Sequence, residues 1–265
     1  MFDACIARWQ LTLDGTPVVT STSRLLPVLY NGSPAMLKIA LEAEERHGAA
    51  LMRWWGGKGA ARVLAHEGEA LLLERALGTT SLAALARQGN DDEACRILCR
   101  TAARLHRPAN RPLPPLVPLT HWFRELAPAA AGHGGLFSLC SATAQMLLAR
   151  PQDAGVLHGD IHHGNVLHFG ARGWLAIDPK GLWGERGFDY ANLFCNPDGE
   201  TATVPGRLAR RATIAAAESG LERKRLLQWV LAWSGLSAAW YLADGAAPEL
   251  QLSIASAAAA ELRLC

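Results

Sequence analysis

The spacing of apolar and polar residues divides the chain into a strand-rich first part and a helix-rich remainder. In the first part, strand-like runs fall at 9–13, 18–20, 24–30, 35–40, 62–64 and 70–73. Asn31-Gly32 is a strong hairpin signal between two of these strands, and a helical period covers 41–55. We therefore expect a small antiparallel sheet with one helix at the N-terminal end.

Beyond residue 77 the apolar spacing is mostly helical. Gly78 breaks the preceding strand, and Thr79-Thr80-Ser81 supplies hydroxyl groups that can cap a helix. Between 107 and 118, five prolines and no regular period predict a rigid surface loop. Helical runs are predicted at 82–88, 91–106, 122–126, 136–150, 189–194, 206–218, 221–242 and 248–264.

Composition argues against several classes of protein. Half of the 265 residues are apolar, yet no run approaches the roughly 20 apolar residues that a membrane helix needs. The first ten residues, MFDACIARWQ, hold an acid, an arginine and no apolar segment, so we expect no secretory signal. The formal charge is only +2 and basic residues are interspersed with acids, which argues against nucleic acid as a partner.

The six cysteines, at positions 5, 95, 99, 140, 195 and 265, form no C-x-x-C pair. Cys95 and Cys99 are spaced to share one face of a helix, and we expect both to be packed thiols. A disulfide framework is not expected in a chain of this length without a signal peptide. These features predict a cytoplasmic protein with no membrane attachment and no obligate protein partner.

The stretch 156–180, VLHGDIHHGNVLHFGARGWLAIDPK, concentrates the chemistry of the chain. Its two short apolar runs, 166–169 and 174–177, flank a glycine-containing turn and predict a hairpin. Asp160 and Asn165 precede the first strand and Asp178 follows the second, so the three side chains converge at one end of the pair. Their oxygens suit a hard cation such as Mg²⁺ that shares its ligands with phosphates. The pattern therefore predicts a phosphoryl-transfer site.

The motif spacing of this stretch resembles that of kinases. His158-Gly159-Asp160, Asn165 and Ile177-Asp178 follow the order of the kinase catalytic loop and metal-binding aspartate. The longer run HGDIHHGNVL…GWLAIDPKGLWGERGFDYAN is similar to the aminoglycoside 6-O-phosphotransferases, or streptomycin 6-kinases, of the aminoglycoside/hydroxyurea antibiotic resistance kinases. Further similarity extends over nearly the whole chain, at PAMLKIA, GAARVL, DDEACRILC, AARLH, RRA and SGLSAAW.

This resemblance implies an α+β, bilobal fold like that of protein kinases. A small antiparallel β lobe over 1–76 would bind the nucleotide and end in a hinge, and a larger, mainly helical lobe over 77–265 would carry catalysis and substrate binding. The implied reaction is ATP- and Mg²⁺-dependent transfer of the γ-phosphate to a hydroxyl of a cationic aminoglycoside. The most specific expectation is the 6-hydroxyl of streptomycin, with resistance as the result.

The resemblance also implies roles for individual residues. Asp160 would accept the proton of the acceptor hydroxyl, while Asn165 and Asp178 would hold Mg²⁺. Lys38 would grip the α- and β-phosphates, as the lysine of V-A-I-K does, although on its strand alone it is typical of a solvent-facing residue. Glu45 is the acid expected to orient Lys38, with Glu44 as the alternative.

Other implied positions support the nucleotide and the catalytic loop. The backbone of Glu74 and Ala76 would bond the adenine at the hinge. No G-x-G-x-x-G is present, and the polar loop with Ser21 and Thr22 would replace it over the phosphates, a plain turn being the alternative. His158 would bond backbone near Asp178. A further support residue, Asp189 of GFDYAN, would brace the catalytic loop.

For the acceptor, a cationic aminoglycoside calls for carboxylates and aromatic faces. The candidates are Asp244, Glu185 and Trp240, followed by Trp183, Asp198 and Glu249. For each, packing or plain solvation is the alternative. Lys180 follows Asp178-Pro179 and could either assist at the phosphates or hinder a cationic substrate.

Three other functions remain open from the sequence. The first is a kinase of another small metabolite, such as hydroxyurea, a sugar or an amino alcohol. The second is a kinase-fold protein that binds nucleotide without catalysis, although Lys38, Asp160 and Asp178 are all retained. The third is a metal hydrolase built on the clustered histidines, at 158, 162, 163 and 168. Adjacent His162 and His163 would face opposite ways, which disfavours it.

Overall fold

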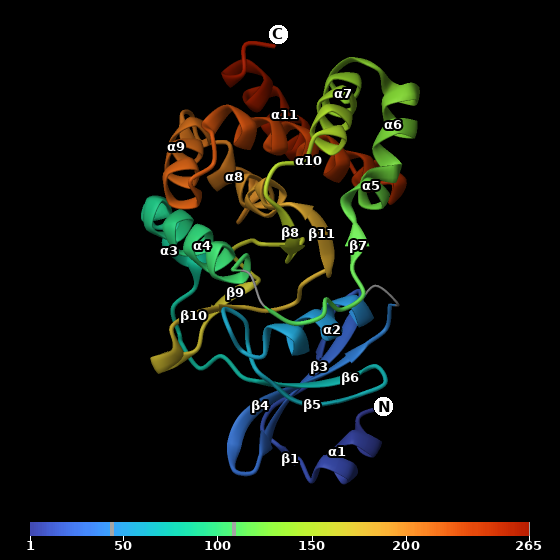
Figure 1. Ribbon diagram of the computed structural model, residues 1–265. Helices are drawn as coiled ribbons and strands as arrows, with labels where there is room; N and C mark the ends of the chain where they lie inside the picture. The colour runs from blue at the N-terminus through green and yellow to red at the C-terminus, as the bar shows by residue number, and fades with distance from the viewer. Residues whose placement is uncertain (43–44, 108–109, 265) are drawn as a thin grey trace.

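A computed structural model describes residues 1–42, 45–107 and 110–264. The chain forms two lobes, a β-sheet lobe that contains the N-terminus and a helical lobe that contains the C-terminal end (Figure 1). The antiparallel sheet lobe and the helical lobe match the predicted fold class. The last strand of the sheet ends at Glu74, and the next helix begins at Leu82. The predicted domain boundary at residue 76 falls between these two elements and stays a prediction.

The sheet of the first lobe is antiparallel throughout, in the order β1-β3-β4-β6-β5 with β2 beside β3. Its strands are β1 (Thr12–Leu13), β2 (Val18–Val19), β3 (Ser23–Tyr30), β4 (Ser33–Ala40), β5 (Val63–Glu67) and β6 (Ala70–Glu74). Asn31 and Gly32 both have positive φ, at 49° and 75°, as a tight two-residue hairpin turn requires. The hairpin expected at this dipeptide is therefore present.

The strand predicted over 9–13 is confirmed only at Thr12–Leu13, because helix α1 (Asp3–Trp9) and its C-terminal cap Gln10 precede β1. Phe2, Ile6 and Trp9 are spaced at helical intervals and pack against the apolar cluster under the sheet. Gln10 then ends the helix in the left-handed conformation, with φ of 51°. The alternation of apolar and polar residues from Trp9 onward could not indicate this helix, because most of the helix and its apolar contacts lie before that segment.

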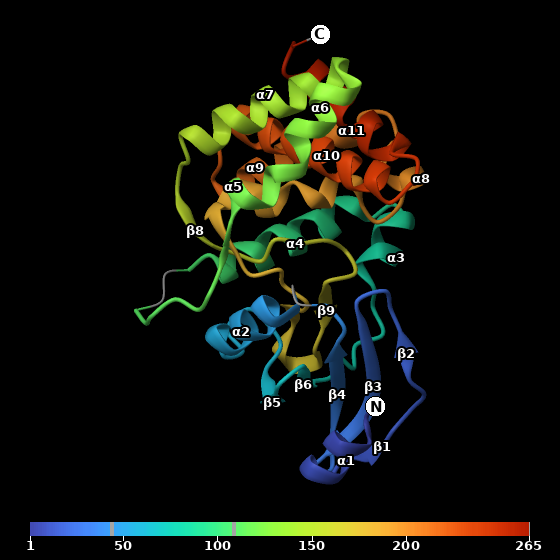
Figure 2. The same ribbon diagram turned by 90° about the vertical axis from the view of Figure 1, so that its right-hand side faces the viewer.

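Helix α2 (Glu45–Trp55) lies between the sheet and the helical lobe (Figure 2). It starts at Glu45, and Glu44 lies outside the described residues. Gly48 permits a very close approach of this helix to the segment after Asp178, because a Cβ atom there would lie 2.1 Å from the carbonyl oxygen of Pro179. The hairpin of β9 (Val166–His168) and β10 (Trp174–Ala176) also reaches the first lobe, through a bridge between Ala60 and Ala176.

The second lobe is built on α10, which is buried along most of its length and contacts α7, α9 and α11. Its helices are α3 (Leu82–Arg87), α4 (Asp91–Leu105), α5 (Leu119–Trp122), α6 (Leu126–His133), α7 (Gly135–Ala149), α8 (Gly199–Ala202), α9 (Arg207–Ser219), α10 (Arg223–Ala243) and α11 (Glu249–Glu261), with 3-10 turns η1 (Phe123–Glu125), η2 (Gly170–Arg172), η3 (Arg186–Tyr190) and η4 (Asn192–Cys195). A small sheet of β7 (Val117–Pro118), β11 (Leu182–Glu185) and β8 (Ala154–Leu157) completes the lobe.

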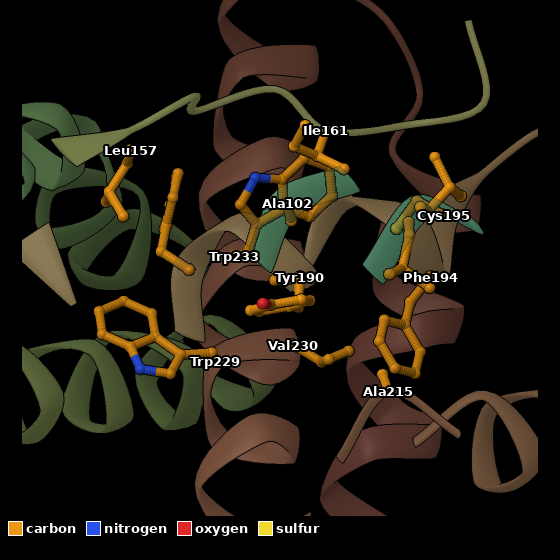
Figure 3. Packing of buried hydrophobic residues seen from close by; sticks show 14 of the residues in the cluster. Ala102, Leu157, Ile161, Tyr190, Phe194, Cys195, Ala215, Trp229, Val230 and Trp233 are labelled. Atoms are coloured by element: carbon orange, nitrogen blue, oxygen red, sulfur yellow. The ribbon is translucent and has the colours of Figure 1, made fainter. Parts of the chain in front are cut away.

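Aromatic residues of η3 and η4 pack against α10 in the core. In Figure 3 the ring of Tyr190 lies between those of Trp229 and Phe194, and all three side chains are at most 1% exposed. Cys95 and Cys99 are buried thiols, as expected from their spacing. In the part of the chain that the structure describes, none of the helices has the length and apolar character to cross a lipid bilayer.

Candidate active site

Lys38 connects three parts of the chain at the junction of the lobes. It lies in β4, paired with Leu25 of β3 on one side and Leu71 of β6 on the other. Its ammonium group contacts the carboxylates of Glu45, at the start of α2, and of Asp178, after β10. Lys38 is only 8% exposed, so burial strengthens both ion pairs relative to a surface pair. The structure thus brings together three residues that the sequence predicted to share a site.

Asp178 stands in an uncommon backbone conformation, with φ of 61°. A non-glycine residue adopts this left-handed region rarely, and such strain concentrates at functional sites. Burial by itself would raise the pKa of the Asp178 carboxyl, but the charge and hydrogen bond of Lys38, with a further contribution from Lys180, lower it below the ordinary value. Asp178 is therefore an anion at neutral pH.

Asp160 is held by two amide side chains. The Nδ2 group of Asn165 donates to the Asp160 backbone oxygen and to Oδ2, both at 3.0 Å. Asn192 donates to Oδ1 over 2.7 Å. With both oxygens engaged, the carboxylate has a fixed direction. The motif spacing predicted Asp160 and Asn165, whereas Asn192 was missed, although it ends the FDYAN run.

The loop from His158 to Asn165, which matches the kinase catalytic loop in its motif and is called the catalytic loop below, is anchored by Asp189 in η3. Its carboxylate accepts the backbone N–H groups of His158, at 2.8 Å, and Gly159, at 2.7 Å, and contacts Nε2 of His106 at 2.8 Å. Burial alone would raise the pKa of Asp189, but the hydrogen bond and charge of His106 outweigh it and lower the pKa. This geometry is what a bracing acid requires.

His158 joins the loop to the strand before Asp178. Its Nδ1 accepts the N–H of Asp160 at 3.1 Å, so its Nε2 carries the proton and donates to the carbonyl of Ile177 at 2.8 Å. The ring also stacks on Trp55, with centroids 6.0 Å apart. Burial lowers the pKa of His158, which keeps the ring neutral. The bond to backbone near Asp178 is the one expected from the sequence.

The oxygen atoms around this loop fit a magnesium ion. Both side-chain hydrogen bonds of Asn165 use its amide nitrogen, so its Oδ1 is the side-chain atom left to coordinate. Lys38 occupies Oδ1 of Asp178, and the second carboxylate oxygen is the other potential ligand. Two such oxygens with phosphate oxygens are the hard donor set that Mg²⁺ prefers. In the described residues, no group of three or more His, Cys, Asp or Glu side chains is arranged to hold a metal.

A pocket of about 340 Å³ lies beside Lys38, on the face of the sheet opposite the apolar cluster that packs on α1. Its lining is mostly apolar and includes Met36, Leu71, Leu73 and Phe169, together with Lys38 and Asp178. Apolar walls with a cation at one side suit a nucleotide base and its phosphates. Asp160 is not among the residues that line this pocket.

The predicted hinge and phosphate loop border this pocket in part. Glu74, Ala76 and Thr22 line it, whereas Ser21 is exposed and lies outside the lining. The carboxylate of Glu74 is bound to Arg172 and to the backbone N–H of Arg62, so its side chain ties the β9–β10 hairpin to the sheet.

The loop before β3 is a hydrogen-bonded turn that also faces the pocket. The hydroxyl of Thr20 accepts the backbone N–H of Ser23 at 3.0 Å, and the N–H of Thr20 donates to the carbonyl of Ser23 at the same distance. The turn foreseen as the alternative for this loop is therefore present, and Thr20 and Thr22 also line the pocket. Contact of this loop with phosphates stays a prediction.

The structure corrects the expectation that Glu185 binds the acceptor. Glu185 is 1% exposed, and its oxygens accept hydrogen bonds from Arg225, Trp229 and the N–H of Gln152. A carboxylate with every lone-pair direction engaged inside the core has nothing to offer a substrate. Its sequence context, between a glycine and an arginine, gave no sign of this burial.

Two further acceptor candidates, Trp240 and Asp244, lie at the C-terminal end of α10. Trp240 is partly buried and packs edge-to-face on Trp122, with centroids 5.7 Å apart. Asp244 is exposed, where α10 ends. Among the described residues, neither makes a hydrogen bond or ion pair with Asp160, Asn165 or Asp178. Their contact with an acceptor stays a prediction.

The histidines of the loop do not converge on one point. His162 is partly buried, its Nδ1 accepts the N–H of Gly164 at 3.1 Å, and its Nε2 lies 3.9 Å from Oδ1 of Asp160. His163 is buried, near Arg211 and Asp91 instead. The adjacent rings thus point into different surroundings, as their alternation predicted. This arrangement disfavours the hydrolase alternative.

Comparison with known proteins agrees with this geometry. Residues 8–245 match the family model described as aminoglycoside/hydroxyurea antibiotic resistance kinase. The chain is 54% identical over 243 residues to a streptomycin 3''-kinase from Klebsiella pneumoniae, covering 90% of this chain and 91% of the relative. It is 35% identical over 272 residues to a streptomycin 6-kinase from Streptomyces griseus, covering 96% and 87%.

Solved structures of low sequence identity share the fold. An aminoglycoside phosphotransferase from Streptomyces rimosus superimposes with a TM-score of 0.59 at 18% identity, covering 90% of this chain and 95% of that one. This likeness concerns the arrangement of the backbone. It confirms the predicted fold class, a β lobe and a helical lobe joined as in the kinases.

Proposed function

Because the chain belongs to the aminoglycoside/hydroxyurea antibiotic resistance kinase family, we propose that it transfers the γ-phosphoryl group of ATP to a hydroxyl of streptomycin. The observation that carries the proposal is the contact of Lys38 with both Glu45 and Asp178, beside a catalytic loop whose Asp160 has both oxygens oriented. Phosphoryl transfer requires a cation that binds the nucleotide phosphates and a carboxylate that orients the acceptor hydroxyl.

Each residue has a defined task in this reaction. Asp160 orients the acceptor hydroxyl toward the γ-phosphorus and takes its proton, while Asn165 and Asn192 keep the carboxylate in place. Lys38, held by Glu45, binds the α- and β-phosphates. When bound, Mg²⁺ neutralises phosphate charge, and Asn165 and Asp178 would hold it. The apolar pocket beside Lys38 takes the adenine.

Two hydroxyls of streptomycin are candidates. The 3''-hydroxyl is supported by the relative that is 54% identical, which is named a 3''-kinase. The 6-hydroxyl, expected from the motif resemblance, is supported by relatives at 35% and 34% identity, both named 6-kinases. Because 54% over nine tenths of the chain is the stronger likeness, we propose the 3''-hydroxyl first.

The test is mass spectrometry of streptomycin after incubation with the protein, ATP and Mg²⁺, with a metal-free reaction as control. One added phosphate that depends on Mg²⁺ supports the proposal, and NMR of the product then identifies the hydroxyl. Unmodified streptomycin with ATP still bound refutes this acceptor. Hydroxyurea, a sugar or an amino alcohol is then offered in the same assay.

A further inference from the structure

Lys180 places a second ammonium group between the nucleotide side and the acceptor side of the site. Its Nζ lies 3.8 Å from Oε1 of Glu45 and 4.0 Å from Oδ2 of Asp160. Glu45 uses its other oxygen, Oε2, to hold Lys38. A continuous line of charges therefore runs from Lys38 through Glu45 and Lys180 to Asp160.

The backbone that carries Lys180 is fixed on both sides. Its N–H donates to the carbonyl of His158 over 2.7 Å, which ties it to the catalytic loop. The next residue, Gly181, has φ of 70°, and a Cβ atom there would lie 2.8 Å from Cβ of His47 in α2. Only a residue without a side chain fits this approach. The ammonium group thus projects from an anchored segment, and 23% of the Lys180 side chain is exposed toward solvent.

The net charge of the groups around Lys180 indicates what its ammonium group can contribute to the reaction. Lys38 and Lys180 face the carboxylates of Glu45, Asp160 and Asp178, so the ionised groups alone carry a net negative charge. A nucleotide triphosphate brings further negative charge into the same space. The reacting atoms must lie about 3–3.5 Å apart, so a γ-phosphoryl group approaching an acceptor held by Asp160 comes within reach of a cation 4.0 Å from that carboxylate.

We propose that Lys180 is a catalytic residue that contacts the γ-phosphoryl group as it passes from the nucleotide to the acceptor. This inference rests on the proposed kinase function. The bond between the γ-phosphorus and the β,γ-bridging oxygen breaks, and ADP leaves with that oxygen and its electron pair. A bond forms from the acceptor oxygen to phosphorus, and the acceptor proton moves to Asp160. Lys180 keeps its proton throughout and stabilises charge on the transferring oxygens.

A purely structural role makes a different prediction. If Lys180 served only as a counter-ion for Glu45 and Asp160, its removal would disturb the site for every nucleotide. A γ-phosphate contact instead distinguishes a triphosphate analogue from a diphosphate. The comparison of AMP-PNP with ADP therefore reports on Lys180 without any need for turnover.

The experiment compares Lys180→Met with Lys180→Arg and with Lys224→Met, an exposed lysine of α10 that serves as the matched control. Calorimetry measures the affinity of each full-length protein for AMP-PNP and for ADP, both with Mg²⁺. We expect Lys180→Met to lose about tenfold in AMP-PNP affinity and to keep its ADP affinity, with kcat for streptomycin lower by about 10²-fold. Lys180→Arg should recover part of both losses, and Lys224→Met should match the wild type.

Retained ADP affinity also shows that the variant is folded. If Lys180→Met does not fold, Lys180→Gln takes its place in the same measurement. Equal loss of AMP-PNP and ADP affinity, or no loss of either, overturns the inference. If the wild type leaves streptomycin unmodified while Lys180→Met still loses AMP-PNP affinity selectively, the proposed acceptor fails and the inference about Lys180 stands.

Discussion

The side-chain amide of Asn192 donates a hydrogen bond of 2.7 Å to Oδ1 of Asp160. Asn192 is itself held, because Nδ2 of Asn196 donates to its backbone oxygen at 3.0 Å and to its Oδ1 at 2.9 Å. The carbonyl of Asn196 accepts a hydrogen bond from Arg211, which forms a buried pair with Asp91 of α4. The direction of the Asp160 carboxylate is thus set from the core of the helical lobe.

Replacement of Asn192 by alanine should lower kcat at least about tenfold, because a misdirected carboxylate loses much of the benefit of orientation. The KM for ATP should stay near the wild-type value, since Asn192 contacts the loop and not the nucleotide pocket. Steady-state kinetics measures both. Asn196→Ala, one contact further away, is the control and should show a smaller loss of kcat. A parallel change in ATP affinity and kcat would show that Asn192 only supports the fold.

The isosteric pair Asp160→Asn and Asp178→Asn should separate chemistry from metal binding. Asparagine at 160 cannot take the acceptor proton, so kcat should fall by about 10²–10⁴-fold while AMP-PNP still binds. Asparagine at 178 removes the charge of the proposed Mg²⁺ ligand, so the gain in AMP-PNP affinity on addition of Mg²⁺ should shrink. Calorimetry with and without Mg²⁺ distinguishes the two. Loss of nucleotide binding in Asp160→Asn would contradict the assigned role.

Glu185→Leu should destabilise the protein by about 3–5 kcal/mol, because it leaves the buried charge of Arg225 without its partner. Urea denaturation measures the free energy of unfolding. Asp244→Leu, at an exposed acid that was also an acceptor candidate, should change it by no more than about 0.5 kcal/mol. Adding Arg225→Met to Glu185→Leu should restore part of the loss. A loss of the same size at both acids would refute this account.

A structural feature could be predicted from the local sequence where the residues in contact lie within the same short segment of the chain. Asp160 and Asn165 share one loop, and their hydrogen bond follows from a spacing of five residues. The Asn31-Gly32 turn is local in the same way. These features could be predicted because no distant packing is needed to form them.

Other features depend on contacts that the local pattern does not contain. Glu185 is buried because Arg225 and Trp229, some 40 residues later, surround its carboxylate. Lys180 faces Glu45 from the other lobe, so its two possible roles could not be separated in the sequence. Helix α1 was missed because its apolar face is completed by the underside of the sheet. Tertiary packing decided each of these cases.

His163 is a buried titratable group in the middle of the catalytic loop. It is 3% exposed, and neither ring nitrogen has a hydrogen-bond partner among the described residues. Burial, followed by the nearby charge of Arg211, lowers its pKa to about 3, whereas Asp91 and Asp198 act in the opposite direction and His162 adds to the lowering. The ring is therefore neutral in the folded protein at neutral and mildly acidic pH.

This depressed pKa predicts a loss of stability in mild acid. The unfolded chain takes up a proton on this histidine below pH about 6.5, and the folded chain does not until pH about 3. The stabilisation is therefore complete above pH 6.5 and declines as the pH falls toward 3, by roughly 2 kcal/mol at pH 5. His158, whose pKa burial also lowers, acts in the same direction. The buried carboxylates contribute only below about pH 4, because the pKa values of Asp91 and Asp189 are lowered.

His163→Phe removes the titrating group and keeps a ring of similar size in the core. The free energy of unfolding is measured in urea at pH 7.5 and at pH 5. Its decrease between these two pH values should be smaller for this variant than for the wild type, and the difference should be roughly 2 kcal/mol. His121→Phe, at an exposed histidine, is the matched control and should keep the wild-type pH dependence. Because each protein is compared with itself at two pH values, any constant effect of the new ring cancels. Identical pH dependence in all three proteins would mean that His163 is protonated in the folded state, with a partner that balances its charge.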